Sequence, residues 1–196
     1  MIINPFSGRF VAFEGTDGSG KSAQFSRAKN ILMAHGVDAV YVKEPTSPLI
    51  YDMLNDRHPI RNFTDMGQLE RQQYYFRDRI DHYRRTVLPA LKGGKHVISD
   101  RSLASVVLDV EKVGDLEMLL ADEERMFAEA DVPFVRPDLI IVFDVPVEIA
   151  LERLGKKQRN PDFFEHGDKI ALTREAYREF AEKFGDFTVV VDNIDS

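Results

Sequence analysis

Residues 15–22 read Gly-Thr-Asp-Gly-Ser-Gly-Lys-Ser, the G-x-x-x-x-G-K-[ST] pattern of a phosphate-binding loop. The loop follows an apolar run at residues 10–13 and precedes a helix-like stretch that extends to His35. A strand that leads through a glycine-rich turn into a helix points several backbone N–H groups at one spot, where the helix dipole also favours an anion. The sequence therefore predicts a binding site for a nucleoside triphosphate.

Each residue of this loop has an expected part in holding ATP. Its glycines allow the tight turn and the close approach of the backbone to phosphate. Lys21 is expected to point into a cleft, away from the core, and to reach the β- and γ-phosphates, while the Ser22 hydroxyl is expected to bind Mg²⁺. The predicted ATP-binding residues of the loop are Gly15, Thr16, Asp17, Gly18, Ser19, Gly20, Lys21 and Ser22.

Length and composition narrow the class of protein. The 196 residues, 43% of them hydrophobic and 30% charged, fit one globular domain over residues 1–196. No apolar stretch approaches the roughly 20 residues that cross a bilayer, and the N-terminus lacks a secretory signal, so we expect a cytoplasmic protein without membrane contact. The absence of cysteine excludes disulfides and thiolate metal sites. A net charge of −7 argues against a partner nucleic acid, which needs a broad basic surface.

Short apolar runs alternate with longer helical patterns, which favours an α/β fold. We expect a P-loop NTPase-type parallel five-stranded sheet with helices on both faces, in three α/β/α layers, with each strand covered on both faces. The predicted strands are residues 9–13, 39–43, 96–99, 139–143 and 188–191. The predicted helices run from the loop to 35, over about 65–91 with Pro89 marking a bend or an early end, and over 117–129, 148–154 and 173–184.

Ligands in open parallel sheets bind outside the carboxyl ends of the strands. The residues at these positions are 14–22, Glu44 with Pro45, Asp100 with Arg101, and Asp144. Several of them carry the acidic or basic groups that a phosphoryl-transfer site uses, so we expect the site at this edge.

Four features now stand in order along the chain: the phosphate loop, Lys43-Glu44-Pro45-Thr46, Asp100-Arg101-Ser102 and Lys156-Lys157-Gln158-Arg159. In this order and spacing the chain resembles the thymidylate kinase family of nucleoside monophosphate kinases, over roughly residues 9–177. The resemblance implies an enzyme that transfers a phosphoryl group from ATP, with Mg²⁺, to a deoxynucleoside monophosphate, with dTMP as the expected acceptor and dTDP as the product. It also implies a homodimer.

The resemblance assigns roles to residues of the acceptor side. Asp17 is expected to meet the acceptor sugar, and Arg101 to clamp its phosphate. Arg79 is expected to recognise the acceptor while Tyr75, one helical turn earlier, stacks on the base; the i, i+4 spacing puts both on one helix face.

Two acids complete the expected site. The resemblance places Asp100 near Mg²⁺ and the transferring group. Glu44 follows the second strand and is expected to orient a basic partner on the acceptor side.

Positive charge for the transition state is expected from a lid at residues 155–166. Some members of the family supply it from an arginine inside the phosphate loop, but position 18 is glycine here. The lid carries Lys156, Lys157 and Arg159, of which Arg159 is the expected catalytic group. Arg153, one turn before the lid, is the next candidate to touch the phosphates of ATP.

The departures from the family pattern surround the acceptor. Thr46-Ser47 replaces two glycines, and Ser102 replaces an aromatic residue. Residues 50–54 contain no arginine where one is expected, and Arg57 and Arg61 are the alternatives for it. Asp100-Arg101-Ser102 also resembles the deoxynucleoside kinases, in which a glutamate acts as base on a 5′-hydroxyl. That activity, and a non-catalytic ATP-binding protein, are the alternatives. Arg79 and Arg101 together favour a phosphorylated acceptor.

Overall fold

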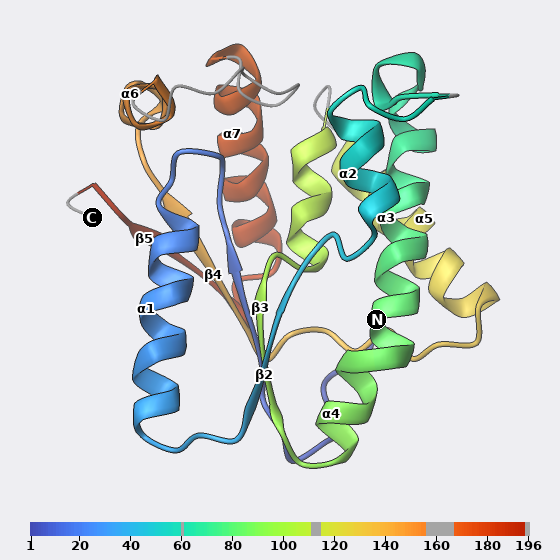
Figure 1. The fold of residues 1–196 in the computed structure, drawn as a ribbon, viewed down its shortest axis with the longest axis vertical. Coiled ribbons are helices and arrows are strands. Elements are labelled where there is room, and N and C mark those ends of the chain that lie inside the picture. Colours follow the sequence, from blue (N-terminus) through green and yellow to red (C-terminus); the bar gives the residue numbers. More distant parts are fainter. Residues whose placement is uncertain (60, 111–114, 156–166, 195–196) are drawn as a thin grey trace.

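A computed structural model describes residues 1–59, 61–110, 115–155 and 167–194. Its centre is a parallel sheet with helices on both sides (Figure 1). The strand order is β2-β3-β1-β4-β5. This confirms the predicted five-stranded parallel sheet, and each strand lies within one residue of its predicted bounds. The strands are β1 Phe10–Glu14, β2 Ala39–Lys43, β3 His96–Asp100, β4 Leu139–Asp144 and β5 Thr188–Asp192.

Side chains that point to opposite faces of the sheet form two separate clusters of the core. Phe13, Ile98 and Phe143 form a cluster with apolar side chains of the helix after the loop. Their neighbours along the strands, among them Phe10 and Val97, belong to the larger cluster on the opposite side. Successive side chains of a strand point to opposite faces, so both faces of the inner strands are covered.

The described part of the chain contains seven α-helices. Helix α1 lies on one side of the sheet, and α3, α4, α5 and α7 lie on the other (Figure 1). Two 3₁₀ segments, Phe63–Asp65 and Leu103–Asp109, precede α3 and follow β3. The helices are α1 Lys21–Ala34, α2 Pro48–Leu54, α3 Gln68–His82, α4 Leu88–Lys92, α5 Asp115–Glu129, α6 Val147–Gly155 and α7 Gly167–Lys183.

The long helix predicted over about residues 65–91 continues past Pro89, so the expectation of an early end there is wrong. A π-helical turn at Tyr83–Val87 joins α3 to α4, and Gly93 caps the end. The N–H of Leu88 bonds to the carbonyl of Tyr83, five residues earlier. This wider turn precedes the proline, whose ring would clash with the carbonyl four residues earlier in a regular α-helix.

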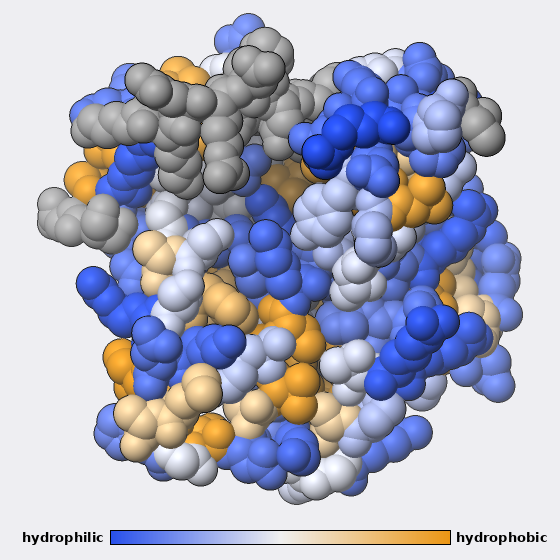
Figure 2. Space-filling model, in the orientation of Figure 1, coloured by the Kyte–Doolittle hydropathy of each residue, from blue (hydrophilic) through white to orange (hydrophobic). Residues whose placement is uncertain are grey.

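The two edge strands are less covered than their apolar sequences predict. Val189, Val190 and Val191 of β5 are 45%, 44% and 40% exposed, so the expectation that every strand is covered on both faces is wrong for β5. Most of β2 is only half-buried, and apolar residues gather near it in the centre of the face shown in Figure 2. A continuous apolar run therefore marks an edge strand here as well as an inner one.

The register of the sheet brings the carboxyl ends of its strands together. Asp100 is the Cα partner of Phe13 on one side and of Lys43 on the other. On the far side of β1, Glu14 pairs with Val142 of β4. The residues that follow these strands consequently meet at one edge of the sheet, as predicted.

Candidate active site

The phosphate loop connects β1 to α1 and needs glycine where the backbone is most crowded. A Cβ on Gly15 would lie 2.6 Å from the carbonyl oxygen of Phe143, and Gly18 has φ +79 against the backbone of Ala150. The loop closes through a bond of 3.1 Å from the N–H of Ser19 to the carbonyl of Thr16.

The N-terminus of α1 is left open toward this loop. Gly20 is its N-cap, no side chain caps it, and its first turn contains no acidic residue. An uncapped helix N-terminus beside such a loop is a ready site for phosphate.

Lys21 and Asp100 form a buried ion pair at the base of the loop. Lys21 is 6% exposed and Asp100 is 4% exposed, so the expectation that Lys21 points into a cleft away from the core is wrong in this structure. Burial and the nearby Arg101 lower the pKa of Lys21 to about 8, although Asp100 and Glu14 oppose this shift. The ammonium is thus held between a carboxylate and the place predicted for phosphate.

Arg101 turns sharply out of β3 toward the loop. Its backbone has φ +78, a left-handed conformation that costs a non-glycine residue about 1–3 kcal/mol and concentrates at functional sites. Its Nη2 donates a hydrogen bond of 2.9 Å to Oδ1 of Asp17. Its Nη1 is buried and has no hydrogen-bond partner among the described residues. One arm of the guanidinium is therefore left without a hydrogen bond in a residue that lines the pocket described below.

Glu14 holds the backbone turn at Arg101 in place. The fully buried Oε1 of Glu14 accepts a hydrogen bond of 2.6 Å from the N–H of Ser102, the residue after Arg101. Its Oε2 accepts bonds of 2.8 Å from Ser105 and 2.9 Å from Tyr177 of α7. Burial raises the pKa of this carboxyl despite the opposing charge of Arg101. The sequence places Glu14 at the end of a strand, but nothing local in it reveals these partners.

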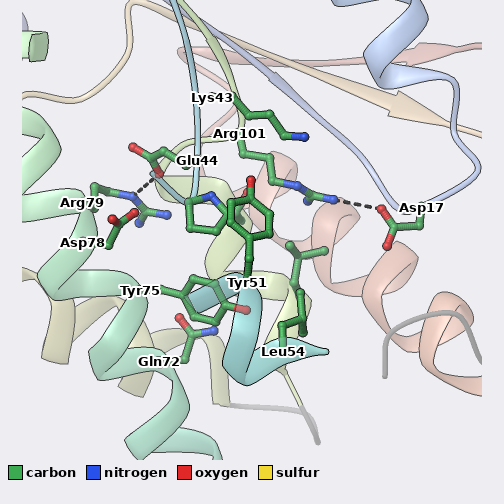
Figure 3. Close-up of a pocket in the computed structure, with 13 residues that line it drawn as sticks. Asp17, Lys43, Glu44, Tyr51, Leu54, Gln72, Tyr75, Asp78, Arg79 and Arg101 are labelled. Atoms are coloured by element: carbon green, nitrogen blue, oxygen red, sulfur yellow. Dashed lines mark hydrogen bonds and ion pairs between the residues drawn. The ribbon is translucent and has the colours of Figure 1, made fainter. Parts of the chain in front are cut away.

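A pocket of about 210 Å³ opens next to the loop, between β2, α2, α3 and the residues after β3 (Figure 3). All five residues predicted for the acceptor side line it. Two of these residues, Asp17 and Arg101, lie 84 residues apart in the sequence and are in direct contact. The pocket residues are Asp17, Lys43, Glu44, Pro45, Tyr51, Leu54, Gln72, Tyr75, Asp78, Arg79, Arg101, Ser105 and Leu108.

Arg79 enters the pocket wall from α3 as part of a buried charge cluster. Its Nε donates to Oε2 of Glu44 at 2.7 Å, and its Nη1 pairs with Glu123 of α5. Burial would raise the pKa of Glu44, but Arg79 and His82 outweigh it and hold this pKa below its usual value. At Glu123 burial prevails and raises the pKa to about 7. Glu44 thus orients a basic partner as predicted, whereas Glu123 was not foreseen.

The loop after β2 is fastened to α3 at the position where the family has glycine. The N–H of Thr46 donates to Asp78 at 2.7 Å, and its hydroxyl donates to the same carboxylate at 2.6 Å. Asp78 lines the pocket with Tyr75, which lies 5.3 Å from the ring of Phe63. The departure at Thr46 therefore adds one hydrogen bond to the rim of the pocket, that of its hydroxyl, which a glycine could not make.

On the other side of the loop, Arg153 of α6 contacts the backbone of the phosphate loop. Its Nη1 donates to the carbonyl of Gly18 at 3.4 Å, and its Nη2 donates to the carbonyls of Asn193 and Ile194 at 3.0 and 2.7 Å. The side chain of Asn193 also donates to the carbonyl of Ser19 at 2.6 Å. Arg153 is thus placed against the predicted ATP site.

The expected lid, residues 155–166, lies outside the described residues except for Gly155. The same holds for its basic residues Lys156, Lys157 and Arg159. Ser22 is exposed in the first turn of α1. Within the described ranges no three acidic or histidine side chains gather as a ready-made metal site. No helix of the described chain is long and apolar enough to cross a membrane.

Comparisons with known proteins point in one direction. The model of the thymidylate kinase family matches residues 13–195 of this chain. The thymidylate kinase of Geobacillus sp. (strain WCH70) is 31% identical, over 94% of this chain and 88% of that protein. The thymidylate kinase of Tropheryma whipplei (strain Twist) is 36% identical, over 76% of this chain and 71% of that protein. A crystal structure of thymidylate kinase from Ehrlichia chaffeensis has the same fold, with a TM-score of 0.67 at 21% identity over 94% of this chain and 92% of that one.

Proposed function

This chain belongs to the thymidylate kinase family, and from that premise we propose which of its residues carry out the phosphorylation of dTMP to dTDP with ATP as donor. The observation that carries the assignment is the ion pair between Asp17 and Arg101, 2.9 Å long. It joins the phosphate loop to the adjacent pocket through one contact. Two nucleotides that occupy the two sides would meet at this point.

The loop and the start of α1 bind the triphosphate of ATP. Backbone N–H groups of the loop and the uncapped N-terminus of α1 supply hydrogen bonds and a favourable dipole. Lys21 adds the positive charge nearest to these groups, while its pairing with Asp100 fixes its position. Arg153 contacts the carbonyl of Gly18 and supports the loop from the other side.

The residues at the loop suit Mg²⁺ bound mainly through the nucleotide. Ser22 presents an exposed hydroxyl at the start of α1, and Asp100 ends the neighbouring strand β3. The described residues offer no cluster of three acids, and Mg²⁺ characteristically takes one or two protein oxygens and completes its shell with phosphates and water. When bound there, Mg²⁺ would neutralise charge on the β- and γ-phosphates.

The pocket binds dTMP with its phosphate toward the loop. Arg101 binds the acceptor phosphate through the Nη1 that has no partner in the described structure. Tyr75 stacks on the base from α3, and Arg79, held by Glu44, presents the rest of its guanidinium to the base edge. Asp17 meets the sugar and keeps Arg101 in place. Phosphoryl transfer needs chiefly this alignment and positive charge around the migrating group.

Positive charge on the migrating group comes from the lid, with Arg159 as the catalytic group. The enzyme is one domain over residues 1–196 that works as a homodimer in the cytoplasm, without nucleic acid or membrane. A net charge of −7 supports the absence of nucleic-acid and membrane partners, because coating either anionic surface needs a basic patch.

The test is ADP release with a panel of acceptors, comparing wild type with Arg101→Ala. Wild type should use dTMP best, dUMP less well and thymidine little. Arg101→Ala should weaken dTMP binding by about 2–5 kcal/mol, the scale for removing one partner of a desolvated charge pair, and leave ATP affinity unchanged. Faster turnover of thymidine than of dTMP would favour a nucleoside kinase, and equal weakening of ATP binding would move Arg101 to the donor side.

A further inference from the structure

Helix α2 presents a neutral hydroxyl, and no cation, to the pocket. The helix, Pro48–Leu54, contains no basic residue. Ile50 and Met53 are buried against the Phe63 cluster and anchor the helix. Tyr51 instead lines the pocket. The side of α2 that reaches the pocket therefore carries a phenol group.

Three donors lie together in this part of the pocket. Figure 3 shows the hydroxyl of Tyr51 directed toward the side chains of Arg101 and Lys43. Neither the Tyr51 hydroxyl nor the Lys43 ammonium has a hydrogen-bond or ion-pair partner among the described residues, although both residues line the pocket. The Nη1 of Arg101 is likewise without one.

The other charges of the pocket are already paired. Arg79 is held by Glu44 and a second acid of α5, and Asp78 accepts two bonds from Thr46. Asp17 pairs with Nη2 of Arg101. A dianionic group entering the pocket would consequently find its free positive charge at Lys43 and its free guanidinium arm at Arg101.

The phenol is kept in its donor form. Burial, followed by the negative charge of Asp100, raises the pKa of Tyr51, with Asp78 adding to the effect and Arg101 opposing it. A neutral phenol donates one O–H, and a hydrogen bond to a charged oxygen is among the stronger ones in proteins.

From these positions we propose that Tyr51, Lys43 and Nη1 of Arg101 together form the binding site for the 5′-phosphate of the acceptor. Tyr51 donates its O–H to one phosphate oxygen, and Lys43 supplies a second positive charge beside that of Arg101. The proposal rests on the proposed function of the same pocket. It makes Tyr51 and Lys43 the residues that distinguish a nucleoside monophosphate from a nucleoside.

The first experiment measures binding of dTMP and of thymidine to Tyr51→Phe by calorimetry. Loss of a hydrogen bond to a charged oxygen should weaken dTMP binding roughly 10-fold or more and leave thymidine binding unchanged, because thymidine has no phosphate. The matched control is Tyr74→Phe, since Tyr74 packs against the same Phe63 cluster without lining the pocket. This control should bind both ligands like wild type.

The second experiment neutralises Lys43. Lys43→Gln should weaken dTMP binding roughly 10-fold and reduce its dependence on salt, because a charge–charge attraction is lost. Lys92→Gln makes the same change of net charge on an exposed residue at the end of α4 and should bind dTMP like wild type.

The outcomes separate this inference from the proposed function. If Arg101→Ala loses dTMP while Tyr51→Phe and Lys43→Gln bind it normally, the inference fails and the function stands. If Tyr51→Phe weakens dTMP and thymidine equally, the hydroxyl supports the fold of the pocket and the inference is again wrong. If Arg101→Ala also binds dTMP normally, the assignment of this pocket to the acceptor fails.

Discussion

Lys21 pairs with Asp100 at the start of α1, beside the loop proposed to bind phosphate, so its charge should govern the pH dependence of ATP use. Its pKa is lowered to about 8, with burial as the largest cause. Because kcat/KM reports the free enzyme, we expect kcat/KM for ATP to fall as pH rises through about 8. Bound triphosphate adds negative charge, so kcat at saturating ATP should persist to higher pH. Steady-state kinetics between about pH 6.5 and 9.5 check this.

Raising the pH is expected to change the stability of the fold through Lys21 in the opposite direction to its effect on kcat/KM. An unfolded lysine keeps its proton to its ordinary pKa of 10.5, above the value of about 8 in the folded protein. Between these values the unfolded chain binds more protons, so the contribution of Lys21 to the free energy of unfolding rises with pH. Circular dichroism at each pH is the control, because it shows whether the enzyme is still folded where kcat/KM falls. A kcat/KM that stays level well above pH 8 would contradict the assigned role.

Arg101 combines a side chain proposed to bind the acceptor with a backbone at φ +78, and two substitutions separate these properties. Both Arg101→Gly and Arg101→Ala remove the guanidinium and should lose dTMP affinity alike. At φ +78, however, alanine keeps the left-handed strain of about 1–2 kcal/mol and glycine does not. We expect the glycine variant to be more stable than the alanine variant by about 1 kcal/mol in urea unfolding. Equal stability would mean that the turn is not strained.

At the scale of elements, the Tyr177 hydroxyl ties α7 to β1 through Glu14. Tyr177→Phe removes a donor from a fully buried carboxylate, and we expect it to lower the free energy of unfolding by about 1–3 kcal/mol. Tyr41 is the matched control, because its buried hydroxyl has no partner in the described structure. Tyr41→Phe should be neutral or slightly stabilising in the same urea titration. A similar loss in both variants would show that the ring, and not the bond to Glu14, is responsible.

The proposed lid, residues 155–166 with Arg159 as its catalytic group, is the second feature whose role can be tested directly. Charge that arrives only on closure stabilises the transition state more than the ground state, so it should act on kcat. Arg159→Ala should lower kcat by about 10²-fold or more, within the range of donated arginines in phosphoryl transfer, and change KM for ATP much less. Stopped-flow or coupled kinetics give both parameters. If neutralising residues 157 and 159 together leaves kcat unchanged, Arg153 becomes the better candidate.

For the whole molecule, the two nucleotides should stabilise the fold through different residues. A ligand that binds only the folded state raises the melting temperature, by an amount equivalent to about 2.7 kcal/mol at 100 times its Kd. Lys21→Ala should lose the shift caused by ATP and keep that caused by dTMP, and Arg101→Ala should do the reverse. Each shift is taken against the unliganded variant, because removing Lys21 leaves Asp100 unpaired and buried at a cost of about 3–5 kcal/mol. Loss of both shifts in either variant would show that the two sites are not separate.

The sequence predicted the sheet and much of the pocket because both depend on local patterns. Short apolar runs fixed the strands, and the carboxyl-end rule placed Asp17, Glu44 and Arg101 at one edge. Residues that act through distant partners had no such signal. Glu123 meets Arg79 across 44 positions, and Glu14 meets Tyr177 across 163, so only the packing of α3 on α5 and of α7 on the sheet reveals them.

The local environment also decided which predictions failed. Lys21 matches the motif of an open phosphate site, yet the neighbouring strand end supplies Asp100 and buries it. The valines of β5 read as an inner strand, but strand order places them at the edge of the sheet. The burial of a segment depends on its neighbours in the fold, and the sequence of the segment itself does not reveal them.

The contact between Gly18 and α6 limits how this enzyme can evolve. A Cβ at position 18 would lie 2.5 Å from the carbonyl oxygen of Ala150 and 2.8 Å from its Cα. An arginine at position 18 of the loop would therefore clash with α6 as the helix is placed in this structure. α6 would have to move first, and that step alone brings no catalytic gain. Proteins descended from this chain are expected to keep Gly18 and to vary in the proposed lid. In a lineage that gained an arginine at position 18, the changes in α6 should have come first.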